Sequence, residues 1–216
     1  PRIVGETGGK DFIVAHPDGD RKALSVAMLR GSFEFQGQKC SAASRAYIPE
    51  SVWNAIKDDY CAEVAKITVG DPRDFTNFMS AVIDKKSFDN ITGYIDRAKA
   101  DPGCEIVTGG GYDGSVGYFI EPTTIVCSDA KYESMSEEIF GPVLSVYVYP
   151  DEEFEAILKT CDETSEFALT GSIFARDRRH IVTAMKALRY SAGNFYINDK
   201  PTGAVVGQQP FGGARG

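Results

Sequence analysis

Histidine and cysteine are scarce in this 216-residue sequence, and paired-cysteine motifs are absent from it. It contains two histidines and five cysteines, and no two cysteines have the C-x-x-C spacing. An odd number of scattered cysteines is typical neither of a disulfide framework nor of a thiolate metal site. We therefore expect reduced thiols in a reducing compartment and no bound metal.

Basic residues and long apolar runs are scarce as well. Lysine and arginine number 23 against 31 acidic residues, which gives a formal net charge of −8, and no basic stripe is present. Without such a stripe, nucleic acid and anionic membranes are poor partners. No apolar run reaches the ~20 residues that cross a bilayer, and the opening PRIVGETGGK lacks the layout of a secretory signal. We expect a soluble protein with no nucleic-acid or membrane partner.

Hydrophobic residues, by contrast, make up 43% of the chain, and aromatic residues make up 11%. This composition and length suit one globular domain with a substantial core and exclude disorder. The sequence has no internal repeat, charge block or proline-rich linker, so residues 1–216 are expected to form a single domain. Because it begins at Pro1 and stops straight after a glycine turn, PFGGARG, we expect it to be a piece of a longer protein.

Two segments have the periodicity of amphipathic helices. The first spans residues 51–67, with Ser51 as its candidate N-cap and an apolar stripe made of Val52, Ile56, Tyr60, Val64 and Ile67. The second spans residues 85–100 and ends at an Asp-Pro-Gly turn, and its stripe contains Phe88, Ile91, Ile95 and Ala98. Each stripe can bury one face of its helix.

The later half of the chain alternates between strand and helix patterns. Strands are predicted at 142–149, 169–175 and 193–198, with helices between them at 151–161 and 177–190. Such alternation implies right-handed crossovers, so the fold class is α/β, a mostly parallel twisted sheet with flanking helices. Residues 105–126 hold two strand-like runs around a triple glycine, either an extended connection or a hairpin. Neither a helix pattern nor Gly-Lys-Ser/Thr follows those glycines, which disfavours a phosphate loop.

Two further stretches, GETGGKDF (5–12) and FEFQGQKCSAAS (33–44), are unlike ordinary scaffold. In the first, Glu6 precedes a Gly-Gly pair that lets the backbone turn tightly. In the second, Cys40 is flanked by small residues that leave room for a substrate beside a sulfur nucleophile. A catalytic cysteine needs partial exposure and a lowered pKa or a base within reach. The other cysteines are assigned to structure, on helix faces for Cys61 and Cys161, at a strand end for Cys127 and in a turn for Cys104.

Together these stretches resemble the motifs of the aldehyde dehydrogenase superfamily. GETGGKDF resembles its glutamate motif, and F-x-x-x-G-Q-x-C at 33–40 resembles its cysteine motif, at the family's usual interval. SEEIFGPV (136–143) resembles a third signature, and QQPFGGARG resembles the last active-site loop. The resemblance implies that residues 1–216 are the catalytic domain, without the NAD-binding domain and the C-terminal arm. It also implies that this chain is inactive alone and that the full-length protein is a homo-oligomer.

The same resemblance implies a role for individual residues. Cys40 is the nucleophile, and Glu6 is the general base that activates water against the resulting thioester. The Cys40 backbone N–H and a side-chain amide hold the oxyanion. The implied cofactor is NAD, with Glu138 on the nicotinamide ribose and Phe140 near the nicotinamide ring. The implied reaction is the oxidation of a small-molecule aldehyde to a carboxylic acid.

The residue Thr7, the string GQKCSAASRAYIP and the end NDKPTGAVVGQQPFGGAR are similar, more narrowly, to the pyrroline-5-carboxylate dehydrogenase subfamily, which oxidises glutamate semialdehyde in proline degradation. This similarity implies that Ser41, Gly203 and Ala204 hold the substrate carboxylate and that Phe211 forms an aromatic wall. It further implies the mitochondrial matrix for a eukaryotic source and the cytoplasm for a bacterial one.

Four alternatives stay open. The first is an aldehyde dehydrogenase of other substrate specificity, and the second is a relative that passes the acyl group to CoA, which Glu6 disfavours. The third is a cysteine hydrolase, which needs His16 or His180 as a base, whereas each is expected to be a solvated residue. The fourth is a non-catalytic interaction domain with the same fold, against which the presence of Glu6, Cys40 and Glu138 speaks.

Overall fold

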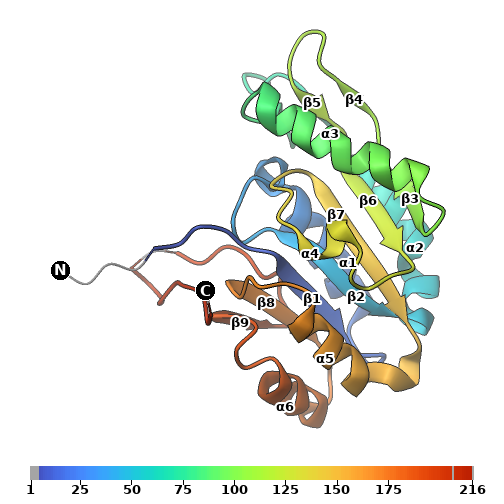
Figure 1. Cartoon of the computed structure of the whole chain (residues 1–216), viewed down its shortest axis with the longest axis vertical. Coiled ribbons are helices and arrows are strands. Elements are labelled where there is room, and N and C mark those ends of the chain that lie inside the picture. The colour runs from blue at the N-terminus through green and yellow to red at the C-terminus, as the bar shows by residue number, and fades with distance from the viewer. Residues whose placement is uncertain (1–4, 206, 216) are drawn as a thin grey trace.

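Seven strands form one twisted sheet in the order β3-β6-β7-β2-β1-β8-β9 (Figure 1). The computed structural model describes residues 5–205 and 207–215. Every neighbouring pair is parallel except β3 and β6, which confirms the predicted α/β class. The strands of this sheet are β1 (Asp11–Ala15), β2 (Ala43–Pro49), β3 (Cys104–Thr108), β6 (Thr123–Cys127), β7 (Val143–Tyr149), β8 (Thr170–Phe174) and β9 (Asn194–Ile197).

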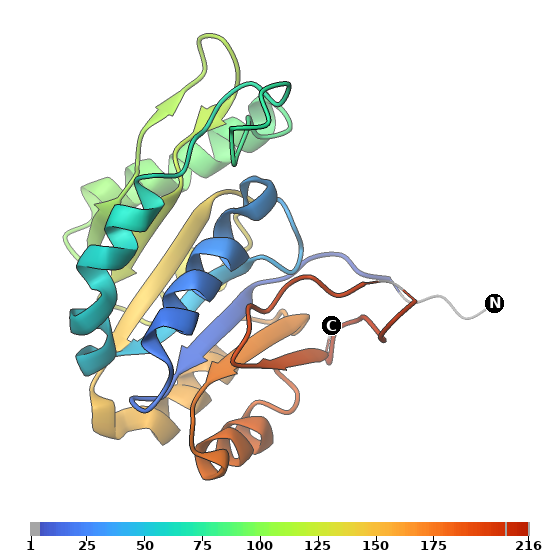
Figure 2. The ribbon, with the colours of Figure 1, turned by 180° about the vertical axis from the view of Figure 1, so that it is seen from behind.

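Helices cover both faces of the sheet. One face carries α1 (Arg21–Phe33) and α2 (Glu50–Val64), as Figure 2 shows. The other carries α3 (Lys85–Ala100), α4 (Glu133–Ser136), α5 (Phe154–Glu163) and α6 (Arg178–Ala187). Short 3-10 turns lie at Glu34–Gly37 and Asp151–Glu153. Within the described residues, every helix is too short or too polar to span a bilayer.

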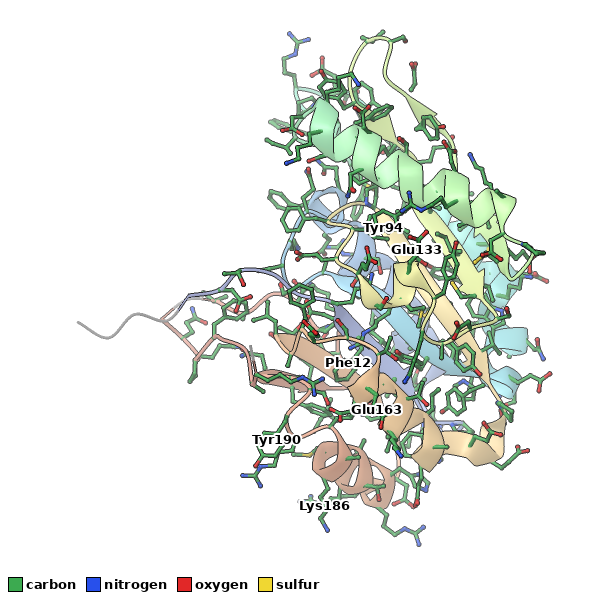
Figure 3. All side chains as sticks on the ribbon, in the orientation of Figure 1. Phe12, Tyr94, Glu133, Glu163, Lys186 and Tyr190 are labelled. Atoms are coloured by element: carbon green, nitrogen blue, oxygen red, sulfur yellow. The ribbon has the colours of Figure 1, made fainter. Side chains whose placement is uncertain are left out.

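The side chains of β1 point alternately to the two faces of the sheet, and each face packs into its own apolar core. Phe12 and Val14 belong to the apolar cluster under α3, α5 and α6, whereas Ile13 and Ala15 belong to the cluster under α1 and α2. Phe12 lies on the face that α5 and α6 cover, and Lys186 at the far side of α6 points away from it (Figure 3). All four β1 side chains are fully buried, as period-two alternation in a doubly covered strand requires.

The helix and strand patterns of the later half are confirmed, with end shifts of a few residues.

The predicted helix at 85–100 is α3 with the same bounds, and its N-cap Asp84 accepts a hydrogen bond from the Ser87 N–H at 2.7 Å. Of its predicted stripe, Ile91, Ile95 and Ala98 are buried. The stripe therefore identified the face that packs on the sheet.

The expected ends of α2 are wrong. Pro49 occupies the N-cap position, so β2 passes directly into the helix, and Ser51 is not the cap. The Ser51 N–H instead donates to Asp151 Oδ1 at 3.0 Å. The helix ends at Val64 rather than at residue 67, because Ile67 donates to the Val64 carbonyl in a following turn. Proline suits the start of a helix because its missing N–H has no partner there.

Residues 105–126 adopt the hairpin alternative. β3 and β6 pair antiparallel, and the chain between them forms a second small ribbon, β4 (Tyr112–Asp113) with β5 (Phe119–Ile120). Gly109 has φ +73°, and a Cβ there would lie 2.1 Å from the Pro122 carbonyl oxygen, so the triple glycine serves the chain reversal. Cys104 is the first residue of β3, opposite Cys127, and is not in a turn as predicted.

The order of the central strands positions the motifs. β7, β2, β1 and β8 are consecutive and parallel, so the segments that lead into them meet at one edge of the sheet, the amino edge. GETGGK precedes β1, GQKCSA precedes β2, and SEEIFGP precedes β7. Segments far apart in the sequence are thereby gathered at the same edge.

Charged residues are buried where β1 and β2 begin. Lys10 is 1% exposed and Arg45 is fully buried. Arg45 donates to the Lys10 carbonyl at 2.9 Å, to the Tyr47 hydroxyl at 3.1 Å and to the Cys161 carbonyl at 3.0 Å. Lys10 Nζ has no hydrogen-bond partner among the described residues. Burial, reinforced by the Arg45 charge, lowers the pKa of Lys10 to about 7.

Replacing Lys10 with methionine is expected to stabilise the protein at neutral pH, since a buried unpaired amine is exchanged for an apolar chain of similar length. Between pH 7 and 10.5 the unfolded chain keeps the Lys10 proton that the folded chain has released. The stability of wild type relative to Lys10→Met therefore rises with pH through that window, by about 1.4 kcal/mol per unit of pKa difference. Urea unfolding of both proteins from pH 6 to 10.5 measures this difference, and a flat difference contradicts it.

Candidate active site

The segment before β1 touches the other two motifs through its glycines. The Gly9 N–H donates to Glu138 Oε1 at 2.9 Å, and a Cβ on Gly9 would lie 2.1 Å from the Cys40 carbonyl oxygen. A Cβ on Gly8 would lie 2.8 Å from Glu138 Oε2. The clash at Gly9 is with backbone, so only glycine allows the approach there, and the Gly-Gly pair joins the glutamate, cysteine and third motifs into one site.

Glu6 lies on the exposed side of this junction, where the Gly8 N–H donates to its Oε1 at 3.4 Å. A pocket of about 270 Å³ borders Glu6, and Figures 1 and 2 both show the C-terminal segment running beside this lead-in. Its lining combines residues 5–8 with residues 166–169, Gly213 and Arg215. The carboxylate thus faces solvent in a hollow built from both ends of the chain.

The cysteine segment reaches the site through a left-handed turn. Phe35, Gln36 and Gly37 have φ values of 55°, 58° and 64°. A Cβ on Gly37 would lie 2.2 Å from the Gly141 carbonyl oxygen, so this turn packs against the third motif. Non-glycine residues in such conformations cost about 1–3 kcal/mol each and persist where the surroundings hold them. The Gln36 side chain donates to the Ala81 carbonyl at 3.1 Å and supplies part of that hold.

Cys40 itself is a half-buried free thiol. Partial burial raises its pKa above 9.0, and the negative charges of Glu6 and Asp11 raise it further. Glu6 is therefore close enough to Cys40 to act on it electrostatically. The pKa of the Cys40 thiol is therefore raised rather than lowered, so of the two features expected of a catalytic cysteine only a base within reach stays a prediction.

Glu138 and Phe140 lie in the loop that leads into β7. Burial raises the pKa of Glu138, although the Gly9 hydrogen bond and Lys10 oppose this. Phe140 has φ +57° and is 41% exposed. A half-buried carboxylate beside an exposed aromatic ring is suited to a ribose with an attached flat ring, so the residues expected to hold the cofactor fit that purpose.

The residues expected to bind the substrate are held in place by two separate hydrogen bonds. Ser41 Oγ shares a 2.8 Å hydrogen bond with Thr202 Oγ1. Thr202 directly precedes Gly203 and Ala204, so this bond links Ser41 to the segment that contains them. Gly203 has φ +111°. Phe211 is 37% exposed, on a segment whose Pro210 carbonyl accepts from Asn194 at 2.8 Å. The first hydrogen bond holds Ser41 against the segment 202–204. The second holds Pro210, the neighbour of Phe211, against β9.

Glu34 is a residue that sequence reasoning missed. Its carboxylate accepts hydrogen bonds from Lys200 at 3.0 Å, Lys39 at 3.2 Å and Arg30 at 2.6 Å. Lys39 precedes the nucleophile and Lys200 precedes the Thr202 segment, so Glu34 joins the two. Burial alone would raise the pKa of Glu34, but these hydrogen bonds outweigh it and hold the pKa below 4.5. The Arg30–Glu34 spacing of four was the available signal.

The histidines are not the solvated residues that were expected. His16 follows β1, and its ring stacks on that of His180 in α6, with 3.6 Å between centroids. Both lie at the carboxyl ends of β1 and β8, whereas Cys40 precedes β2 at the amino edge. Neither histidine can take a proton from Cys40, and the cysteine hydrolase alternative is wrong for these residues.

A family comparison agrees with this arrangement. Residues 1–216 match the family model described as the aldehyde dehydrogenase family. The chain belongs to the aldehyde dehydrogenase family. It is 61% identical to a mitochondrial delta-1-pyrroline-5-carboxylate dehydrogenase of Dictyostelium discoideum and 50% identical to the Homo sapiens protein of the same name. Each alignment covers 100% of this chain and 38% of the relative, so the chain spans less than half the length of these dehydrogenases.

Solved structures of family members show the same fold. A delta-pyrroline-5-carboxylate dehydrogenase from Mycobacterium tuberculosis aligns with a TM-score of 0.92 and 51% identity over 100% of this chain and 39% of that one. A second structure of that dehydrogenase, with the same scores, is described as bound with NAD. The resemblance drawn from four short motifs is thus confirmed at the level of the family and the fold.

The influence of Glu6 on the thiol gives a first prediction for this site. Alkylation of Cys40 by iodoacetamide is expected to speed up with pH to a midpoint above 9, because only the thiolate reacts. Glu6→Gln should move the midpoint to lower pH by removing a negative charge. Glu166→Gln is the matched control, since Glu166 lines the same pocket but is not among the main influences on the thiol pKa. Peptide mass spectrometry of Cys40 measures the rates, and equal midpoints in all three proteins refute the coupling.

Glu34→Gln is expected to lower the free energy of unfolding by roughly 1–2 kcal/mol, since it weakens three charged hydrogen bonds that are partly screened by solvent. Because the folded-state pKa of Glu34 is lowered, this advantage of wild type is complete above about pH 4.5 and disappears as the pH falls further. Urea unfolding checks both points. Glu63→Gln, which weakens an exposed ion pair with Lys66, should change stability by less than about 0.5 kcal/mol.

Proposed function

We propose that this chain supplies the nucleophile and the base for NAD-dependent oxidation of L-glutamate 5-semialdehyde to L-glutamate, in proline degradation. The semialdehyde is in equilibrium with pyrroline-5-carboxylate. The observation that carries the proposal is the junction at Gly9, which contacts Glu138 by a hydrogen bond and the Cys40 backbone directly. Identity of 50–61% to named pyrroline-5-carboxylate dehydrogenases over the whole chain supports the choice of substrate.

In the proposed reaction, the Cys40 thiolate adds to the aldehyde carbon, and the Cys40 backbone N–H donates to the oxyanion that forms. NAD, when bound, supplies the acceptor for the hydride. Glu138 and Phe140 would hold the nicotinamide end of that cofactor. The acyl group stays on the sulfur as a thioester, and Glu6 takes a proton from the water that hydrolyses it.

The exposure of Glu6 suits its part in this sequence. A carboxylate that faces a pocket of about 270 Å³ can reach a water molecule there, and Cys40 is near enough for its ionisation to feel the Glu6 charge. The acid product carries a second carboxylate that the aldehyde lacks. Because Glu6 activates water instead of attacking the thioester itself, hydrolysis releases the acid without a further covalent intermediate.

Ser41, Gly203 and Ala204 would hold the α-carboxylate of the substrate. The Ser41 hydroxyl already shares a hydrogen bond with Thr202, so it is oriented before the substrate arrives. The positive φ of Gly203 turns the backbone of this segment sharply, which can direct successive N–H groups toward one anion. Phe211, partly exposed, would cover the aliphatic part of the substrate.

The setting of this reaction is proposed on the same grounds. The chain would be the catalytic domain of a longer homo-oligomeric dehydrogenase, with no nucleic-acid partner. The Dictyostelium discoideum and Homo sapiens relatives are named as mitochondrial, which supports the mitochondrial matrix for a eukaryotic source. A bacterial source would place the protein in the cytoplasm.

NADH formation by the full-length protein without CoA tests the proposal. We expect glutamate semialdehyde to be strongly preferred over an uncharged aldehyde of the same chain length. Cys40→Ser should lower kcat/KM by at least about 1,000-fold for both aldehydes, because the nucleophile is lost. Ser41→Ala should raise KM about tenfold for the charged substrate alone.

Cys61→Ser serves as the control, since Cys61 lies on α2 away from the motifs. Equal use of the two aldehydes would leave the family chemistry but overturn the substrate. Turnover of neither aldehyde would favour an interaction domain instead, full activity of Cys40→Ser would overturn Cys40 as the nucleophile, and a strict requirement for CoA would favour the acylating relative.

A further inference from the structure

A second cluster of chemically active side chains lies at the carboxyl edge of the sheet. His16 and Asp18 are in the loop after β1, and His180 is in the first turn of α6. His16 Nδ1 is 2.8 Å from Asp18 Oδ1, and His180 Nδ1 is 3.3 Å from Asp18 Oδ2. Two imidazoles thus face the two oxygens of one carboxylate.

The backbone holds this carboxylate in place. Asp18 accepts hydrogen bonds from the Arg176 N–H at 3.2 Å and the Asp177 N–H at 2.9 Å, both in the turn that follows β8. The His16 N–H donates to the Phe174 carbonyl at 2.8 Å, and the Gly19 N–H donates to the His16 carbonyl at 2.9 Å. Main-chain bonds therefore fix both turns of the cluster, and the Asp18 N–H also donates to His16 Nδ1 at 3.2 Å.

The rings are partly covered and open on one side. They stack at 3.6 Å with 24° between their planes, and Phe154 packs edge-on against His16 at 4.6 Å. The His16, Asp18 and His180 side chains are 15%, 30% and 34% exposed. An apolar wall behind the rings and solvent in front suit a bound ion that keeps water among its ligands.

We propose that His16, Asp18 and His180 form a binding site for a divalent transition-metal ion, with zinc as the expected ion. Imidazole nitrogen and carboxylate oxygen are the ligands that such ions take in proteins. The three ligand atoms lie within 4.8 Å of one another. Bonds of about 2.0–2.1 Å in a tetrahedral site separate two ligand atoms by about 3.3 Å. The N–O distances of 2.8 and 3.3 Å are near that separation.

Binding requires a small rearrangement of the rings. Each imidazole must present an unprotonated Nδ1, so binding releases to solvent any proton held there. The ion also replaces the hydrogen bond that the Asp18 N–H donates to His16 Nδ1. The stacked rings must also tilt apart so that both lone pairs converge. Asp18 keeps its two backbone hydrogen bonds in this process, as carboxylates that ligate metals commonly do. Water completes the ligand set at the open side.

The surrounding charges permit a cation. Arg176 is paired with Asp20 at 3.1 Å, and Arg179 is paired with Asp177 at 2.6 Å, so these two neighbouring guanidinium groups are compensated. The chain as a whole carries a formal net charge of −8. A bound ion would join the β1–α1 turn to the start of α6, at the edge opposite Cys40. The site is independent of the proposed oxidation.

Zinc and cobalt titrations of the full-length protein test the site. We expect calorimetry to find a zinc-binding event in wild type that His180→Gln weakens by at least about tenfold. At the same zinc concentration, Tm should rise more for wild type than for His180→Gln. Glutamine suits a helix and replaces a side chain that is 34% exposed, so this variant is expected to fold. Asp18→Asn gives a second, independent removal of a ligand.

Asp59→Asn, an exposed carboxylate on α2, is the matched control and should bind zinc as wild type does. Cobalt absorption distinguishes nitrogen and oxygen ligands from cysteine thiolates, which add intense near-ultraviolet bands. Binding that survives in both His180→Gln and Asp18→Asn overturns the proposal, as do thiolate bands or no binding in wild type.

Discussion

The close approach of three backbone segments at Gly9 is the constraint on which the site depends. The Gly9 position has no room for a Cβ, because the Cys40 carbonyl oxygen would lie 2.1 Å from it. Gly37 meets Gly141 in the same way, at 2.2 Å. These contacts exist because β7, β2, β1 and β8 are neighbours in a parallel sheet, so their lead-in segments arrive at the same edge. A side chain at either glycine would separate the nucleophile from the carboxylates.

The same edge carries an energetic cost in its core. Lys10, Asp11 and Arg45 are almost completely buried where β1 and β2 begin, and burial raises the pKa of Asp11 as it lowers that of Lys10. An apolar core would be more stable than such a group of charges. The Lys10 amine and Glu138 influence each other electrostatically. Buried charge near Glu138, which is proposed to hold the cofactor, is a cost in stability of the kind found at functional sites.

Much of the site could be predicted from the sequence, because short motifs name their own residues. The motifs that contain Glu6, Cys40 and Glu138 meet at Gly9, and α3 matches its apolar stripe. The helix α1 was missed, since Val26 is exposed while Gly31 and Ser32 are buried, which blurs its periodicity. The pairing of His16 with His180 was also out of reach, because it requires β8 to lie beside β1 and no local pattern reports that adjacency.

Glu6 and Cys40 make opposing demands on the same small volume. In the proposed reaction Glu6 would serve the hydrolysis of a thioester, yet its negative charge raises the pKa of the Cys40 thiol, which would have to ionise first. Solvent exposure of Glu6 screens this repulsion without removing it. A cation brought to Cys40 would offset both the burial of the thiol and the Glu6 charge. The positively charged nicotinamide ring that Glu138 and Phe140 are proposed to hold would have that property, so a bound cofactor would offset a charge that the described residues leave uncompensated.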